Sequence, residues 1–371
     1  MTIEDLALIF VRGVGPRTIT HLVDLYGSAE QIFAASKADL IERGGLRQEI
    51  AERIVRRDGF TEAYREVDYC RKHRISLLAA TDREYPELLR EVSDRPHVLF
   101  VRGNVGALSQ RMLSMVGTRD MSPAGQDVCN RLIQQLGERV DDLCIVSGLA
   151  YGVDAACHRA ALAYGVNTVA VIASALPSVT PSVHSALAND IVEHGGAIVT
   201  ELHSQSPQNG TLFLARNRII AALSAGTLVV ESPASGGSLA TADMADGYHR
   251  VVMAIPGRIT DGASFGTNNL IRSGKARLVL TASDIIDDIG WQIEDRDVAK
   301  MTSGTDALES LQPAERLAYS VIEKRVTVSL VEILEETGLS MGDLSMAIMT
   351  LELQGLIRKL PAQRYELTQR N

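Results

Sequence analysis

Residues 213–244 read FLARNRIIAALSAGTLVVESPASGGSLATADM, and this stretch decides the fold class. Its first part predicts a helix with an apolar side and with Arg216 and Arg218 at the edge of that side. Thr227–Glu231 is apolar and predicts a buried strand. The loop Ser235–Ser238 then leads into a second helix, and backbone N–H groups at such a helix start favour an anion such as phosphate.

The same alternation of apolar strand and helix runs through the middle of the chain. The strands are MLSMV, CIVS, TVAVIA, AIVTEL, TLVVES and RVVMAI, starting at Met112. Near-continuous apolar strands separated by helices are typical of a parallel sheet covered on both faces. The sequence therefore predicts an α/β fold, with a Rossmann-like doubly wound, mostly parallel sheet as its core.

Ligands of such sheets bind outside the carboxyl ends of the strands. That rule selects three loops, Gly117–Arg119, Ser147–Asp154 and Ser235–Ser238, which we expect to meet at one edge together with the start of the helix that carries Arg216. A GxGxxG fingerprint after the first strand is missing, and so is an acidic residue at the end of the second. Binding of NAD or FAD is disfavoured, and no cofactor is expected.

The flanks of this core differ from it. Residues 1–75 predict a small helical domain of the SAM or helix-hairpin-helix type, with Gly13-Val14-Gly15-Pro16 as the hairpin. Such a hairpin can donate backbone N–H groups to a DNA phosphate, or it can serve packing alone. Twelve Lys/Arg against twelve Asp/Glu in this segment leave both interpretations open.

Three further segments complete the predicted organisation. Residues 76–290 are a connector plus the Rossmann-like core, residues 291–311 a polar linker, and residues 312–371 a winged-helix domain. The third helix of that last domain, Ser340–Gln354, contains no Lys or Arg. A protein contact or a structural role therefore fits it better than reading of a DNA groove, and only Arg358, Lys359 and Arg364 of the wing are basic candidates.

Composition excludes several other classes of protein. The 371 residues carry a net charge of −9, the wrong sign for coating nucleic acid by bulk charge, so any such binding needs a local pocket. No apolar run approaches the ~20 residues that cross a bilayer, and the acidic start of the chain is unlike a secretory signal, so we expect a cytoplasmic protein without membrane contact. The four cysteines and the histidines show no metal-binding spacing, and we expect buried thiols and no metal.

Five motifs in order give the chain a close resemblance to the DNA-processing protein A family (DprA/Smf). They are Gly117-Thr118-Arg119, Val146–Asp154, Ala215–Ala221, Gly237–Ala242 and Pro256-Gly257. The resemblance implies a non-catalytic protein that binds single-stranded DNA, forms a homodimer through its Rossmann-like core, protects incoming DNA and loads RecA recombinase during natural transformation.

The resemblance also implies which residues hold the strand. They are Gly117, Thr118, Arg119, Ser147, Gly148, Phe213, Arg216, Asn217, Arg218, Gly237 and Ser238. Arginines pair with phosphates and stack on bases, and an aromatic ring is a sequence-blind platform. One departure is a missing lysine: no Lys or Arg lies between Glu201 and Arg216, where some members have one.

Other interpretations of these residues stay open. Arg216 or Arg218 can be paired with Asp154 or Glu231 inside the fold, since a buried arginine is normally matched to a carboxylate. Ser238 can be only the N-cap of its helix.

Two other classes of function also remain. The first is a nucleotide-processing enzyme resembling the nucleoside-monophosphate phosphoribohydrolases, whose PGGxGTxxE loop supplies a catalytic glutamate. Here the matching position is Met244, which cannot act as an acid or base, although Asp243 and Asp246 lie close by in the sequence. The second is a structural adaptor, which the polar strand-end loops disfavour.

Overall fold

The computed structural model describes residues 1–207, 209–292, 311–325, 327–353, 356–360 and 364–367. The chain divides into two compact units, residues 1–292 and residues 293–371, and each is described by itself. Most of the linker predicted over residues 291–311 lies outside the described residues.

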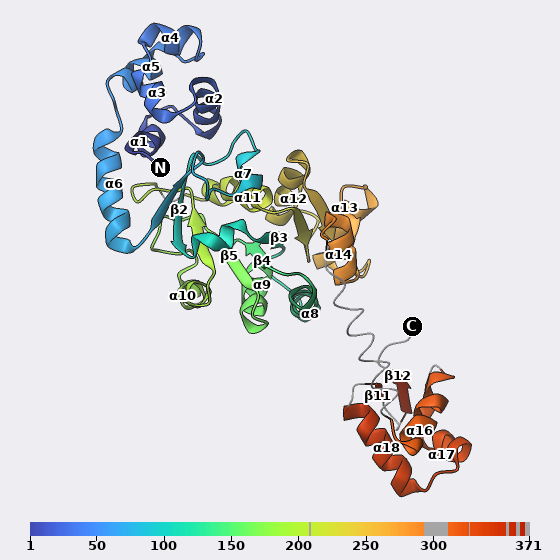
Figure 1. The fold of residues 1–371 in the computed structure, drawn as a ribbon. Coiled ribbons are helices and arrows are strands. Elements are labelled where there is room, and N and C mark those ends of the chain that lie inside the picture. The colour runs from blue at the N-terminus through green and yellow to red at the C-terminus, as the bar shows by residue number, and fades with distance from the viewer. Residues whose placement is uncertain (208, 293–310, 326, 354–355, 361–363, 368–371) are drawn as a thin grey trace. The chain divides into compact units, whose positions relative to one another are not determined.

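A nine-stranded sheet forms the centre of the first unit, in the order β1-β2-β6-β5-β4-β3-β7-β8-β9 (Figure 1). The strands are β1 (Ser76–Ala79), β2 (Val98–Gly103), β3 (Arg111–Val116), β4 (Leu143–Ser147), β5 (Asn167–Val171), β6 (Ala197–Thr200), β7 (Gly226–Val229), β8 (Val251–Ala254) and β9 (Arg277–Leu278). In this sheet order, every pair of neighbouring strands from β6 through to β9 is parallel. The predicted mostly parallel sheet is thus confirmed.

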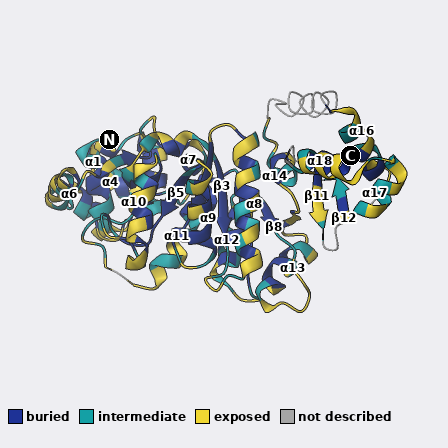
Figure 2. Cartoon of the chain, turned by 90° about the horizontal axis from the view of Figure 1, so that it is seen from below, coloured by how far each residue is buried: buried dark blue, intermediate teal, exposed yellow. Residues whose placement is uncertain are grey.

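Helices cover both faces of the sheet. One face carries α8 (Pro123–Arg139), α9 (Val153–Ala163) and α10 (Ser185–Glu193), and the other carries α7 (Glu87–Arg90), α11 (Thr211–Leu223) and α12 (Gly237–Gly247) (Figure 1). In Figure 2 the strands of the sheet are largely dark blue, the colour of buried residues, while the outer sides of the helices are yellow, the colour of exposed residues. Two further helices, α13 (Phe265–Arg272) and α14 (Ala282–Ile289), close the β8–β9 end.

The predicted connector contributes two strands to this sheet. β1 and β2 pair antiparallel, and β2 pairs antiparallel with β6, with Val101 opposite Val199. Phe100 and Val101 are fully buried, so these strands extend the core rather than only leading the chain into it.

The predicted helical domain is formed by six helices. It consists of α1 (Ile3–Phe10), α2 (Pro16–Tyr26), α3 (Ala29–Ala34), α4 (Lys37–Glu42), α5 (Gln48–Val55) and α6 (Phe60–His73). Among them α4 is a short helix capped by the Ser36 side chain. The Gly13 hairpin packs against α5, where Arg53 donates to the Arg12 carbonyl at 2.7 Å.

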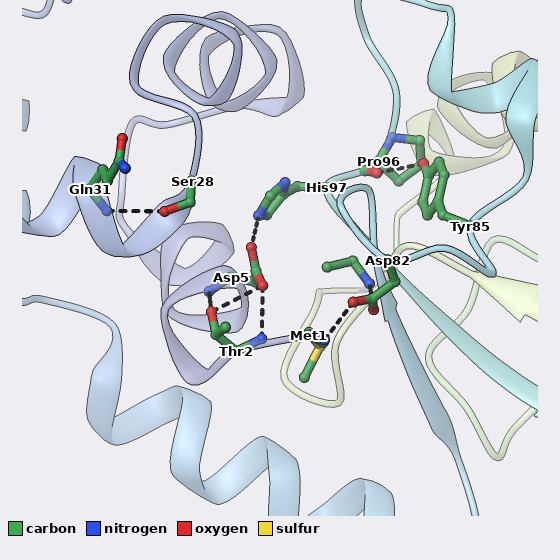
Figure 3. A network of polar contacts seen from close by, with 10 residues as sticks. Met1, Thr2, Asp5, Ser28, Gln31, Asp82, Tyr85, Pro96 and His97 are labelled. Atoms are coloured by element: carbon green, nitrogen blue, oxygen red, sulfur yellow. Dashed lines mark hydrogen bonds and ion pairs between the residues drawn. The ribbon is translucent and has the colours of Figure 1, made fainter.

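A buried polar network joins the helical domain to the connector (Figure 3). His97 Nε2 lies 3.0 Å from Asp5 Oδ1, and both side chains are almost fully buried. Hydrogen bonds from His97 and Thr2 lower the pKa of Asp5, although burial acts to raise it. The terminal ammonium of Met1 pairs with Asp82 at 2.5 Å. Polar contacts thus hold the two parts of this unit together in addition to apolar packing.

A second contact ties the helical domain to the segment that leads into α11. Glu66 of α6 is 1% exposed and accepts a hydrogen bond from the Ser204 backbone N–H at 2.8 Å. One residue earlier, the His203 ring lies 4.4 Å from the Phe10 ring, centroid to centroid. The segment just after β6, which precedes the helix that carries Arg216, is thus held by contacts from outside the core.

The second unit has the predicted winged-helix elements. They are α16 (Pro313–Glu323), β10 (Val328–Ser329), α17 (Leu330–Thr337), α18 (Met341–Leu353), β11 (Ile357–Leu360) and β12 (Arg364–Leu367). The short strand β10, which the sequence did not predict, adds to the hairpin in the order β10-β12-β11. In neither unit does a described helix have the length and apolarity needed to span a membrane.

Candidate nucleic-acid interface

The three predicted loops meet at the carboxyl ends of β3, β4 and β7. The Thr118 N–H donates to the Glu231 carbonyl at 2.8 Å, and the Val153 N–H donates to the Thr118 carbonyl at 3.1 Å. Gly152 has φ +71°, and a Cβ there would lie 2.3 Å from the Thr118 oxygen. Only glycine allows this approach, so the loop after β4 is locked against the loop after β3.

Arg216 lies beneath these loops. Arg216 is 6% exposed. Its Nη1 donates to the Gly148 carbonyl oxygen at 2.6 Å and also to the Val171 carbonyl oxygen. Burial lowers the pKa of Arg216 to about 10, nearby Asp154 acts to raise it, and nearby Arg119 acts to lower it. The pKa of Asp154 is raised by its own burial, against the opposing effect of Arg216.

Gly148 lies between the two charges of this pair. A Cβ on it would meet Arg216 Nη1 at 2.4 Å and Asp154 Oδ2 at 2.6 Å. Asp154 therefore lies near Arg216 and supports its charge electrostatically, while Arg216 Nη1 donates its hydrogen bonds to backbone carbonyl oxygens. The Arg216 guanidinium supports the strand-end loops from below and has little accessible surface left for a ligand.

Arg218 has a partner other than those expected. Its guanidinium pairs with Glu201 at the end of β6, and both side chains are mostly buried. Glu231 instead binds the start of α8, where it accepts from the Ser122 N–H at 2.9 Å. The pKa of Glu201 is raised because its burial outweighs the effect of Arg218. An acidic residue just after a buried strand was the available sequence signal for this pair.

The Ser/Gly loop after β7 corrects one expectation. The N-cap of α12 is Gly236, and no side chain caps the helix, so Ser238 is not the N-cap. Ser238 is buried and its hydroxyl donates to Ser232 Oγ at 3.0 Å. Asn217 of α11 reaches the Gly237 carbonyl at 3.4 Å, which links the two helices that border the site.

Arg119 is the candidate residue most available to a ligand. It is exposed, and it has no carboxylate partner among the residues that the structure describes. Its guanidinium carbon lies 5.7 Å from the centroid of the half-buried Phe213 ring, the geometry of a cation–π contact. An uncompensated cation beside an aromatic ring suits a phosphate and a base together.

Burial divides the eleven predicted residues into two groups. Those with little accessible surface are Ser147, Gly148, Arg216 and Ser238. Those left exposed or half-buried at the edge are Gly117, Thr118, Arg119, Phe213, Asn217, Arg218 and Gly237. Sequence reasoning also missed Tyr151, whose ring is 52% exposed in the loop after β4. An aromatic residue inside a strand-end motif was the signal for it.

Comparison with known proteins identifies the family. The family model of DNA recombination-mediator protein A matches residues 76–290, more than half of the chain. Models of a SAM-like helix-hairpin-helix tandem and of the DprA winged helix domain match residues 5–57 and 305–363. This chain belongs to the DprA family.

Individual relatives agree with that assignment. A putative DNA processing protein DprA from Mycobacterium tuberculosis is 33% identical over 332 residues, covering 86% of this chain and 84% of the relative. The crystal structure of Streptococcus pneumoniae DprA aligns with a TM-score of 0.65 at 31% identity, covering 78% of this chain and 98% of that one. A Helicobacter pylori DprA, whose structure describes its single-stranded DNA binding mode, aligns with a TM-score of 0.51 at 25% identity, covering 57% and 94%.

The winged helix of this DprA-family chain offers little charge for DNA. Its third helix α18 exposes Met341, Met346 and Met349. In the wing, Arg358 pairs with Glu366, and Arg364 donates to Thr327 at 2.8 Å. A third helix without basic residues, and a wing in which only Arg358 is paired with a carboxylate, leave Arg364 and Lys359 as the cations of the wing that DNA could meet.

Of the two carboxylates that the enzyme interpretation left open, Asp243 has a cation partner, whereas Asp246 is exposed on α12. Asp243 is exposed and pairs with Lys275 at 2.8 Å, while Met244 packs against the apolar core. Within the described ranges, no group of three or more His, Cys, Asp or Glu residues is arranged to hold a metal ion.

Proposed function

We propose that this protein binds single-stranded DNA at the carboxyl edge of its core sheet, without catalysing a reaction on it. The observation that carries the proposal is Arg119, an exposed cation over the Phe213 ring at the place where three strand-end loops meet. Phosphate oxygens would pair with Arg119 and with backbone N–H groups of the loops, and a base would stack on the ring. The single-stranded DNA binding described for the Helicobacter pylori relative supports the same ligand.

The rival interpretation as a nucleotide-processing enzyme has less support. It needs an acid or base beside the Ser235–Ser238 loop. Asp154 and Glu231 are buried; Asp154 supports the charge of Arg216, and Glu231 accepts a hydrogen bond from the start of α8. Asp243 is paired with Lys275.

A titration that compares single-stranded with double-stranded oligonucleotides tests the proposal. The net charge of −9 gives no bulk attraction for a duplex, and a base can stack on the Phe213 ring only when it is unpaired. A single strand should therefore bind much more tightly than a duplex of the same length. Raising salt should weaken the binding with a shallow slope, since few phosphates are contacted. Equal affinity for duplex and single strand would contradict the proposal, as would release of a nucleobase during the incubation.

We further propose that two copies of the chain associate through the core. The edge strand β9 leaves Leu278 45% exposed, and Leu280, just beyond it, is 58% exposed. An uncovered strand edge with apolar side chains is a ready site for pairing with a second copy. Two linked pockets would raise the affinity for a long strand, and so compensate for the lysine that is missing ahead of Arg216.

Charge placed on this edge should separate the copies. Leu278→Arg is expected to sediment as a monomer, because two buried cations would face each other in a symmetric interface. Its affinity for oligothymidylates should lose the steep rise with length that two spanned pockets give. Leu317→Arg, on the exposed side of α16, is the matched control. A wild-type protein that already sediments as a monomer would refute the dimer.

The finer role rests on family membership. We propose that the protein acts in the cytoplasm, protects incoming strands and passes them to RecA recombinase during natural transformation. Strand exchange by RecA on strands coated with single-strand-binding protein, with and without this chain, tests this role. No gain in rate or extent would remove it and leave the DNA-binding proposal standing.

A further inference from the structure

Tyr151 is a large aromatic side chain left in solvent inside the proposed site. Tyr151 lies in the loop between β4 and α9 and is 52% exposed. Across the described ranges, no group forms a hydrogen bond with its hydroxyl. The fold therefore makes little use of this ring, although its neighbours Gly152 and Leu149 are held in specific backbone conformations with positive φ.

The backbone around Tyr151 places it beside Arg119. The adjacent Gly152 approaches that loop so closely that a Cβ would lie 2.6 Å from the Arg119 carbonyl oxygen. Tyr151 is thus one residue from direct contact with the loop whose guanidinium lies over Phe213. The Arg119 loop thus meets Phe213 through its guanidinium and the Tyr151 loop through the backbone of Gly152.

One side of the Tyr151 ring is supported. The His184 ring lies 5.2 Å away, centroid to centroid, at an interplanar angle of 59°. His184 is itself buried, and its Nδ1 lies 2.8 Å from the Leu149 carbonyl oxygen. A ring braced by a fixed neighbour loses less conformational freedom when a ligand stacks on it.

We propose that Tyr151 is a second base-stacking platform of the single-stranded DNA site, separated from Phe213 by Arg119. This inference rests on the proposed function and adds to it a subsite for an unpaired nucleobase, with a phosphate held between the two rings. Every base has a π-face, so the platform is blind to sequence. The ligand is a single strand long enough to place bases on both rings.

Two substitutions in the full chain test the aromatic role. Tyr151→Ala should weaken binding of an oligothymidylate by about tenfold, the usual effect of removing one stacking ring. Tyr151→Phe should bind as the wild type does, because it keeps the ring and loses only the hydroxyl. The thermal unfolding midpoint should stay unchanged in both, since the side chain is half in solvent.

A fluorescence measurement distinguishes stacking from an indirect effect. Trp291 is the only native tryptophan, so an introduced one adds a signal that can be separated by difference. Emission from Tyr151→Trp should be quenched when the oligothymidylate binds, because a base lies against the indole. Tyr64→Trp is the matched control: Tyr64 is 59% exposed, but it lies on α6 of the helical domain, and its emission should not change.

The outcomes separate this inference from the proposed function. Unchanged affinity of Tyr151→Ala, or an unquenched tryptophan at position 151, overturns the second platform while the wild type still binds single strands. A Tyr151→Phe variant as weak as Tyr151→Ala assigns the effect to the hydroxyl and also overturns stacking. A wild type that binds no single strand refutes the proposed function and this inference together.

Discussion

Replacing Arg119 with alanine is expected to weaken binding of single-stranded DNA about 100-fold. A bidentate arginine–phosphate contact consists of two charged hydrogen bonds, each worth about 1.5 kcal/mol or more, and a loss of roughly 3 kcal/mol corresponds to about two orders of magnitude in Kd. Arg119 is exposed and has no carboxylate partner in the described part of the chain, so its thermal unfolding midpoint should not change. The measurement is a fluorescence-anisotropy titration at several salt concentrations.

Two further variants make the Arg119 result specific. Arg119→Lys keeps the charge but loses the planar, two-pronged donor and its stacking on Phe213, so its affinity should lie between wild type and alanine. Arg159→Ala removes an exposed arginine from the middle of α9 and should leave both affinity and salt slope unchanged. If Arg119→Ala binds as tightly as the wild type, the strand does not run over this edge of the sheet.

The core of the fold was predictable from local sequence. Strands such as Leu143–Ser147 and Gly226–Val229 are largely apolar and do not alternate with charged residues, which indicates burial on both faces. Their carboxyl ends must then meet at one edge, and this geometric rule placed Arg119 next to the loop after β4. The addition of β1 and β2 to the sheet was not predictable, because it depends on the pairing of Val101 with Val199, far apart in the chain.

The different partners of the site arginines were not predictable either. Arg216 and Arg218 are two positions apart in the sequence and looked equivalent. In the structure Arg216 donates to backbone carbonyl oxygens under the loops with Asp154 nearby, and Arg218 pairs with Glu201 at the end of β6. Which carboxylate reaches which guanidinium depends on tertiary packing, and no spacing rule encodes it. Glu66 is likewise buried against Ser204, a contact between residues far apart in the chain that no local spacing predicts.

Replacing Arg216 with methionine is expected to lower the free energy of unfolding by about 3–5 kcal/mol. Methionine fills much of the same volume, but Asp154 then lies buried without its opposing charge. The carbonyl oxygens of Gly148 and Val171 also lose the donor that joins the ends of β4 and β5. Urea denaturation followed by circular dichroism measures the change. Arg71→Met, which breaks the exposed Arg71–Asp68 pair, should cost less than about 1 kcal/mol.

The double variant Arg216→Met/Asp154→Asn decides between a structural and a ligand-binding role for Arg216. Removing both charges leaves no uncompensated carboxylate, so it should regain part of the stability that Arg216→Met loses. Binding should remain weak in it, because the Gly148 loop that supports Arg119 still lacks its anchor. A loss of stability below about 1 kcal/mol in the single variant, together with abolished binding, would instead mean that Arg216 turns outward and meets the strand directly. In that case the floor of the site would be held by its backbone contacts, chiefly those of Thr118 with Glu231 and Val153.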